Sequence, residues 1–253
     1  MALLNSGSTN PALRQRIFEN HPLAAGQEAM TFTGTINKFM FMFLMLVASS
    51  IYSWNAYSRG ANIAPLLVIG LAGGLILAVV ISFKKEWSPY LAPAYGLLEG
   101  LFVGAISAYL NNAFRLKAPF IVMQAVLLTF GVVIAMLILY KTGIIKVTNR
   151  FVTIVIAATA GIAFFYLLTI ALQFFHIQIP FVYGSSNIGI IFSLVVVGIA
   201  AMNLAIDFAM IDQGAQNGAP KYFEWYCAFG LMVTIVWLYI EILRLLTKLY
   251  SRK

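Results

Sequence analysis

The sequence predicts an all-α integral membrane protein in which seven transmembrane helices form one bundle. Of its 253 residues, 62% are hydrophobic and only 9% are charged, whereas about 25% of residues are charged in an ordinary soluble domain. The mean hydropathy is +0.91. Apolar runs of roughly 20 residues, enough to cross about 30 Å of hydrocarbon, recur with short polar breaks. Long uninterrupted runs predict helices, because a membrane β-barrel needs short segments of strict alternation.

Each run defines one expected span. The seven spans are 36–56, 63–83, 90–110, 119–140, 151–173, 187–208 and 225–246. A membrane domain, 36–247, therefore lies between a polar N-terminal tail, 1–35, and a short basic C-terminal tail, 248–253. The N-terminal tail has no apolar core of the signal-peptide type, so we expect the first span to insert and to stay.

Glycines at four-residue spacing mark the third span. Gly96, Gly100 and Gly104 form one smooth stripe on a helix, which permits a close approach by a neighbouring backbone. The second span repeats this pattern more briefly with Gly70 and Gly74, so we expect these two helices to contact each other. The stripes predict packing and indicate no chemistry.

Basic residues in the short loops predict the orientation of the chain. The side of the N-terminus holds more of them than the opposite side. They are Arg14, Arg16, Lys38, Lys84, Lys85, Lys141, Lys146, Arg150 and Lys221, against Arg59, Arg115 and Lys117 across the membrane. We therefore expect a cytoplasmic N-terminus. The formal charge of +8 also attracts anionic lipid, and no interleaved basic and aromatic surface predicts a nucleic-acid partner.

Asp207 is the most informative ionisable residue, because it ends the charge-free run 188–206. A carboxylate inside a span costs about 2.5 to 3.5 kcal/mol and marks a functional site by default. Asn203, one turn earlier, indicates a polar face that continues inward. The alternative is that Asp207 lies among the headgroups at the end of its helix.

We place Asp207 near the cytoplasmic end of the sixth helix, where Lys84, Lys85 and Glu224 also lie. A salt bridge to one of the two lysines would neutralise the carboxylate and hold two helices together. Protonation of Asp207 would release that bridge. The sequence therefore predicts a pH switch or an ion pathway that involves these residues.

Glu99, Glu241 and Arg244 are further charged residues inside the spans. Glu99 lies about halfway through the third span and must be protonated, paired or in a wet cavity. It is either a proton carrier or pH sensor, or a neutral group that hydrogen-bonds to a neighbouring helix. Glu241 and Arg244 share one helix face and predict a structural ion pair. Glu241 lies about 24 Å along its helix from residue 225, which keeps it from forming a dyad with Asp207.

No motif predicts catalysis. The chain has no paired-histidine zinc motif, no Gly-x-Ser-x-Gly elbow and no phosphate-binding glycine loop. Its two histidines are far apart, so we expect no metal site and no cofactor. Cys227 is the single cysteine and excludes a disulfide within the chain.

Two segments carry a specific resemblance to a known family. They are AAMNLAIDFAMID and GAPKYFEWYCAFGLMVTIVWLYIEILRLL. Over about residues 30 to 250 the chain resembles the Bax inhibitor family, in its bacterial YccA-like branch. The resemblance implies seven helices with the last one in the middle, in a bacterial inner membrane. It also implies a role in pH-sensitive calcium leak, in suppression of cell death, or in modulation of a membrane-bound protease.

The resemblance also implies site residues. In the calcium-leak members, an aspartate on the sixth helix and one on the seventh form a pH-sensing pair. Asp207 matches the first, whereas Thr234 stands at the position of the second. The counterpart of Arg244 pairs with a glutamate on the second helix, and that helix has no acid here. Glu241 or Glu99 is the substitute that we expect.

Two functions follow from these observations. The first is a pH-responsive cation leak, with calcium as the ion that its oxygen ligands suit, Asp207 as gate, Glu99 as a second buried acid and Lys84 or Lys85 as closing partner. The second is a non-conducting regulator that binds a membrane protease or another membrane protein through the glycine-striped helices and the polar N-terminal tail. A third function, proton-coupled transport of a small solute, would need broken helices at mid-membrane. Gly198 is the one residue that suggests such a break, and it is weak evidence.

Overall fold

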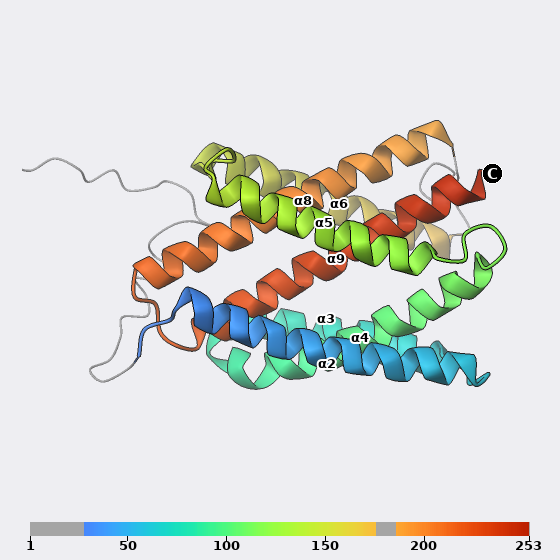
Figure 1. Ribbon diagram of the computed structural model, residues 1–253, viewed down its shortest axis with the longest axis horizontal. Helices are drawn as coiled ribbons and strands as arrows, with labels where there is room; N and C mark the ends of the chain where they lie inside the picture. Colours follow the sequence, from blue (N-terminus) through green and yellow to red (C-terminus); the bar gives the residue numbers. More distant parts are fainter. Residues whose placement is uncertain (1–27, 176–185, 253) are drawn as a thin grey trace, which may run out of the picture.

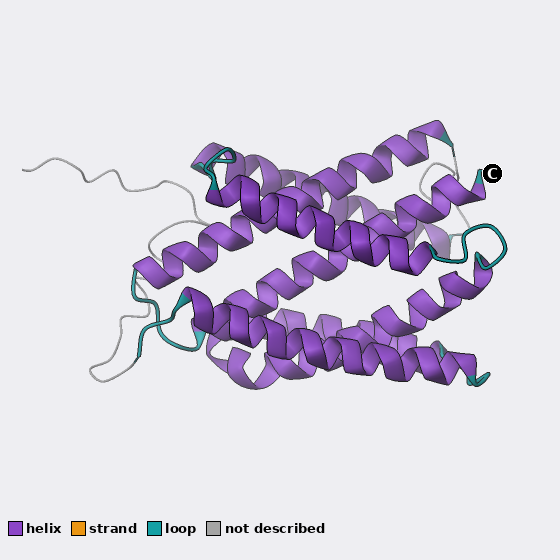
Figure 2. Cartoon of the chain, in the orientation of Figure 1, coloured by secondary structure: helices purple, strands orange, loops and turns teal. Residues whose placement is uncertain are grey.

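Long helices account for nearly all of the part of the chain that the structure describes (Figure 2). The computed structural model describes residues 28–175 and 186–252. Its helices are α2 (Phe32–Ser58), α3 (Ala64–Phe83), α4 (Ser88–Ala113), α5 (Ile121–Lys141), α6 (Asn149–Phe174), α8 (Asn187–Gln216) and α9 (Phe223–Ser251), with a short 3-10 helix, η1 (Lys85–Trp87), before α4. All seven α-helices are long and apolar enough to cross a membrane. The predicted seven-helix membrane fold is confirmed.

The last helix, α9, occupies the centre of the bundle. Figure 1 shows α2, α3 and α4 on one side and α5, α6 and α8 on the other, with α9 crossing between them. It packs against α2, α4, α5 and α8. In its apolar stretch 56% of the residues are buried, against 17% in α3 and in α6. The central position of the last helix, which the resemblance implied, is confirmed.

Polar caps and prolines set where several helices begin. Thr31, Thr148 and Ser186 precede α2, α6 and α8, and each side chain accepts a hydrogen bond from the backbone N–H three residues later. These bonds satisfy N–H groups that the first turn of a helix leaves without a partner. α3 and α4 instead carry a proline in their first turn, where the missing N–H costs nothing.

Several helices extend beyond the apolar runs that predicted them. α8 continues past the expected end at residue 208 to Gln216, and α9 continues to Ser251. The expected boundary at residue 248 therefore lies inside a helix, as does the boundary at residue 35, because α2 begins at Phe32. The length of an apolar run reflects the thickness of the hydrocarbon core, whereas the end of a helix depends on residues that satisfy its last backbone groups. Residues 1–27 of the expected N-terminal tail lie outside the described residues.

The glycine stripes place α4 between α2 and α3. A Cβ atom on Gly100 or on Gly104 would collide with the backbone of α2 at Leu46 or at Ser50. A Cβ atom on Gly70 of α3 would lie 2.7 Å from the carbonyl oxygen of Leu98 on α4. The expected contact between the second and third spans is therefore present. The stripe of α4, however, packs against α2 rather than against α3.

We call the end of the bundle that holds the start of α2 the N-terminal face and the opposite end, which holds the end of α9, the C-terminal face (Figure 1). At the N-terminal face the segment before α2 joins the loop between α8 and α9. The Met30 backbone N–H donates to the Ala219 carbonyl oxygen at 2.7 Å, and the Met30 side chain is buried. This contact fixes the first helix against the start of the last.

Candidate functional site

Asp207 lies well inside α8. The helix continues for nine residues after it, or about 14 Å at 1.5 Å per residue, so Asp207 lies deeper than the sequence predicted. Its side chain is 9% exposed and its Oδ2 atom has no hydrogen-bond partner among the described residues. Buried polar atoms are nearly always paired. A carboxyl oxygen left without a partner at this depth is therefore the strongest functional signal in the bundle.

The face of α9 that meets Asp207 has a small residue and a hydroxyl group. A Cβ atom on Gly230 would lie 3.9 Å from Asp207 Oδ1, and the Thr234 side chain interacts with the Asp207 carboxyl group. Thr234 Oγ1 also donates to the Gly230 carbonyl oxygen at 3.2 Å. The position at which the resemblance expects the second aspartate thus lies beside the first. Here it provides a hydroxyl oxygen in place of a second carboxylate.

Lys84 and Lys85 do not neutralise Asp207. Neither lysine forms an ion pair with it in the part of the chain that the structure describes. The Lys85 ammonium group lies over the rings of Phe223 and Tyr226, 5.8 and 5.2 Å from their centroids. These rings belong to the first turn of α9, whereas the Asp207 carboxyl group lies beside Gly230, one turn after Tyr226. The expected salt bridge is absent because Asp207 lies deeper than the lysines.

Glu224 does not meet Asp207 either, although it is fully buried. Its carboxylate binds the Lys38 ammonium group of α2 and accepts hydrogen bonds from the Thr31 N–H at 2.9 Å and the Thr31 hydroxyl at 3.1 Å. Lys221 Nζ lies 3.6 Å from it. Gly34 leaves room for the carboxylate, since a Cβ atom there would collide with it. Glu224 therefore joins the first turns of α2 and α9.

Lys221 extends this cluster to the surface of the N-terminal face. Its ammonium group lies 3.0 Å from the Glu28 carboxylate. Hydrogen bonding to Glu28, aided by the charge of Glu224, raises the pKa of Lys221 above its ordinary value. Lysine is charged at neutral pH in any case. The cluster therefore does not titrate in the physiological range through Lys221.

Glu99 lies on the side of α4 that meets α3. A Cβ atom on Gly74 of α3 would lie 2.9 Å from Glu99 Oε2. Tyr95, one turn earlier on α4, interacts with the Glu99 carboxyl group through a hydrogen bond. The Tyr95 ring also packs edge-on against Phe229 of α9, with centroids 4.9 Å apart. Glu99 is therefore linked to the central helix through Tyr95, in a different interface from that of Asp207.

Glu241 and Arg244 form a local ion pair near the C-terminal face. Arg244 Nη1 lies 3.3 Å from Glu241 Oε1, and the guanidinium group lies over the Tyr166 ring at 4.7 Å. The Tyr166 hydroxyl donates to both oxygens of Glu241 at 3.1 and 3.2 Å, and Trp237 Nε1 donates at 3.3 Å. The buried Glu241 carboxylate is therefore fully satisfied, and its contacts hold α6 to α9.

The structure also shows polar contacts that sequence reasoning missed. Asp212 on α8 accepts a hydrogen bond from the Tyr140 hydroxyl at 2.9 Å and pairs with Lys141 Nζ at 3.2 Å. Lys248, 4% exposed, donates to the Ser193 hydroxyl at 2.9 Å. The contacts Tyr140–Asp212 and Tyr166–Glu241 join helices that are far apart in the chain, so no local spacing predicts them.

Asn203 does not extend the polar surroundings of Asp207. Its side-chain amide donates to Thr159 Oγ1 of α6 at 2.8 Å and to the Ile199 carbonyl oxygen at 2.9 Å. The polar face expected around Asp207 therefore divides between α6 and α9. Among the described residues no group of three or more His, Cys, Asp or Glu side chains lies together in a way that would hold a metal ion.

Comparison with known proteins gives the family of the chain. No curated protein and no solved structure matches it. A protein-family model described as Bax inhibitor 1 like matches residues 10–251, nearly the whole chain. This match covers the seven helices and both segments that carried the resemblance. The chain is therefore a multi-pass integral membrane protein that belongs to the Bax inhibitor 1 like family.

Proposed function

We propose that the protein is a non-enzymatic, pH-responsive cation leak pathway, in which protonation of Asp207 is the switch and calcium is the cation. The observation that carries this proposal is the buried Oδ2 atom of Asp207 without a hydrogen-bond partner. An ionised carboxylate at this depth must meet a positive charge or take up a proton. Both responses couple the residue to ions or to pH.

The groups that face Asp207 support this role. From α9 they are the Thr234 hydroxyl, the Tyr226 phenol and the Cys227 thiol, none of which is positively charged at neutral pH. From α5, Tyr140 packs against the neighbouring Phe208 ring and gives its hydroxyl to Asp212. From η1, the Lys85 ammonium group lies over the Tyr226 ring, and it forms no ion pair with the Asp207 carboxylate in the described part of the chain. Carboxylate and hydroxyl oxygens are hard ligands of the kind that calcium prefers.

Glu99 is the second acid in this proposal. It lies between α3 and α4 and contacts α9 through Tyr95. We propose that it modifies the response rather than sets it, because it lies in another interface. Lys84 and Lys85 have no closing contact with Asp207 in this conformation, so the switch is assigned to the carboxyl group itself.

The test is reconstitution of the purified protein in liposomes that contain a calcium-sensitive dye. The proposal expects calcium entry above that of protein-free liposomes and a rate that changes with pH. Glu99→Gln is expected to keep a pH-dependent flux with an altered rate. Absence of flux at every pH would refute the leak and leave the second candidate.

The second candidate is a non-conducting regulator that binds a membrane partner such as a protease. A lipid-facing surface of α6 favours it, because Ala157, Ala160 and Gly161 are exposed and a Cβ atom on Gly161 would meet nothing within 4 Å. Small residues on a lipid-facing helix permit close approach by another helix. The stripe of α4 is unavailable for this purpose since α2 covers it.

The orientation and the membrane are further parts of the proposal. Lys38, Lys141 and Lys221 lie at the N-terminal face together with the loops before α4 and α6. This enrichment in basic residues supports a cytoplasmic N-terminal face under the positive-inside rule. The resemblance to the bacterial branch supports the inner membrane. Protease accessibility of the two faces in sealed vesicles tests the orientation.

A further inference from the structure

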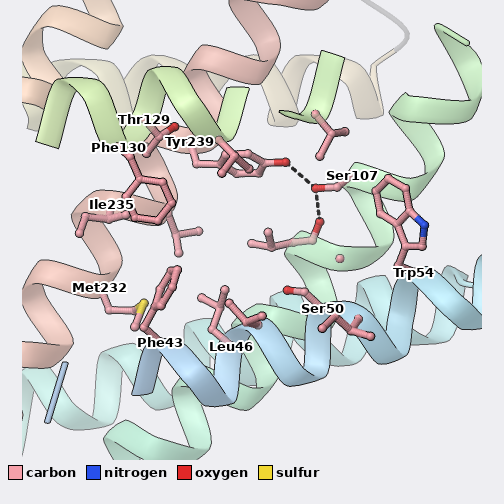
Figure 3. Close-up of a pocket in the computed structure, with 17 residues that line it drawn as sticks. Phe43, Leu46, Ser50, Trp54, Ser107, Thr129, Phe130, Met232, Ile235 and Tyr239 are labelled. Carbon is pink, nitrogen blue, oxygen red and sulfur yellow. Dashed lines mark hydrogen bonds between the residues drawn. The ribbon is translucent and has the colours of Figure 1, made fainter. Parts of the chain in front are cut away.

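A cavity of about 440 Å³ lies between α2 and α5, with α4 and α9 forming its inner wall (Figure 3). Its volume falls within the range of about 300 to 1,000 Å³ that is typical of ligand pockets. The inner wall is buried, as Val103, Met232 and Val236 show, whereas Val126 and Phe130 at the rim are 37% and 42% exposed. The cavity therefore opens sideways, toward the lipid, rather than into the protein.

The cavity offers almost no polar group to an occupant. The Ser107 hydroxyl and the Tyr239 hydroxyl bond to each other at 2.7 Å (Figure 3). Ser50 donates to the Gly100 carbonyl oxygen at 3.0 Å, and Thr129 donates to the Ala125 carbonyl oxygen at 2.7 Å. Since each hydroxyl has a partner within the protein, only an apolar occupant matches this lining.

A second, polar cavity of about 660 Å³ adjoins the first at the C-terminal face. Trp54 lines both cavities. The polar cavity also contains Tyr57, whose hydroxyl accepts a hydrogen bond from the Asn112 amide at 2.9 Å, and Arg115, which forms no ion pair with any described residue. The apolar cavity inside the membrane and the cavity that holds Arg115 thus lie next to each other on either side of Trp54, and we call the two together the path.

The length of the apolar cavity matches the hydrocarbon thickness of one membrane leaflet. On α2 it extends from Phe43 to Trp54, a rise of eleven residues or about 16 Å at 1.5 Å per residue. Half of a hydrocarbon core of about 30 Å is about 15 Å. The Phe43 and Phe130 rings, with centroids 5.9 Å apart, close the inner end. Trp54 and Tyr57 at the outer end are residues of the kind that settle at the membrane interface.

We infer that this path is a binding site for a single glycerophospholipid, with one acyl chain in the apolar cavity and the phosphate in the polar cavity beside Arg115. An arginine guanidinium group matches a phosphate in charge and in bidentate geometry. The site is separate from the interface of Asp207, because its α9 residues Met232, Ile235, Val236 and Tyr239 are those that face α2, α4 and α5.

The acyl part is tested by filling the cavity from its rim. The full-length protein is purified in mild detergent, incubated with phosphatidylglycerol and examined by native mass spectrometry. We expect one retained phospholipid in the wild type and at least a tenfold lower retention in Val126→Trp. Leu127→Trp is the matched control, because Leu127 is the next residue of α5, is 62% exposed and lines neither cavity. Equal retention by V126W and the wild type, or an equal loss in L127W, overturns the inference.

The phosphate part is tested with Arg115→Gln and with diacylglycerol, which has the acyl chains without the phosphate. We expect R115Q to lower phosphatidylglycerol retention about tenfold, the equivalent of about 1.4 kcal/mol, and to leave diacylglycerol retention unchanged. Lys117→Gln, two residues away and outside both cavities, is expected to behave as the wild type. Retention of diacylglycerol as strong as that of phosphatidylglycerol in the wild type overturns the assignment of the phosphate.

A measurement on the wild type covers the case in which a tryptophan at position 126 impairs folding. Phosphatidylglycerol with brominated chains quenches nearby tryptophan fluorescence. We expect part of the fluorescence quenching to saturate at a low mole fraction of this lipid. This saturable quenching is expected to disappear in Trp54→Phe. The same saturable quenching in W54F, or none in the wild type, contradicts the site.

Discussion

Asp207 and Asp212 lie five residues apart on α8 and have opposite surroundings. Asp212 is bound by the Tyr140 hydroxyl and the Lys141 ammonium group, whereas Asp207 has a buried oxygen without a hydrogen-bond partner. The two aspartates of this helix thus differ in role: Asp212 holds α5 to α8, whereas Asp207 is a buried carboxyl group with an unsatisfied oxygen. This contrast makes Asp212 the natural control for every experiment on Asp207.

Asp207→Asn is expected to leave the free energy of unfolding unchanged or to raise it by up to about 1 kcal/mol. The amide has the shape of the carboxyl group without the cost of burying a charge with an unpartnered oxygen. Asp212→Asn is expected to lower stability by less than about 1 kcal/mol, because it removes a partly exposed ion pair. Thermal unfolding of both variants in detergent checks this. A clear loss of stability in D207N alone would show that the carboxylate has a structural role.

Glu224→Gln is expected to destabilise the protein by about 1.5 to 3 kcal/mol, the range for hydrogen bonds to charged groups. The change leaves Lys38 without its counter-charge and weakens two bonds to Thr31. The measurement is the free energy of unfolding. Its control is Glu28→Gln, because Glu28 is exposed and its partner among the described residues is Lys221 at the surface. Equal effects of the two variants would contradict the role of Glu224 in joining α2 to α9.

Gly100→Ala is expected to cost about 1 to 3 kcal/mol, as is typical of overpacking. Its new methyl group would collide with the α2 backbone at Leu46, so the two helices would have to separate. Gly161→Ala is the matched control in α6, where a Cβ atom meets nothing within 4 Å. Melting temperatures of the two variants distinguish them. Similar values would mean that α2 and α4 do not pack as closely as described.

Tyr166→Phe is expected to lower stability by about 1.5 kcal/mol, because the buried Glu241 carboxylate loses a phenol donor. The ring of phenylalanine preserves the stacking under Arg244. Tyr109→Phe serves as the control, since Tyr109 is 55% exposed. The free energies of unfolding check this prediction. An unchanged value in Y166F would show that Trp237 and Arg244 satisfy Glu241 without help.

The sequence predicted the fold well because each span is a local property. A run of roughly 20 apolar residues specifies a membrane helix without knowledge of its neighbours. The Glu241–Arg244 pair was equally accessible, since three residues of spacing put both side chains on one face. The glycine stripes likewise predicted close packing, because a missing side chain is a local feature.

The contacts of the candidate site were not accessible in the same way. Lys38 and Glu224 are 186 residues apart, and their pairing depends on how α2 crosses α9. The depth of Asp207 was misjudged because hydropathy ends at residue 208, whereas α8 continues to Gln216. Sequence alone had no means to measure that extension. As a result the lysines expected beside Asp207 lie nearer to the N-terminal face.

The most direct test of the proposed switch is the calcium flux of wild-type, Asp207→Asn and Asp212→Asn proteins in liposomes over a pH series from about 5 to about 9, a range that brackets the titration of perturbed carboxyl groups. Because asparagine mimics the protonated carboxyl group, the proposal predicts that D207N conducts at a rate independent of pH and equal to that of the wild type at the acidic end. D212N is expected to retain the pH response. A wild-type pH response that persists unchanged in D207N would contradict the assignment of the switch to Asp207.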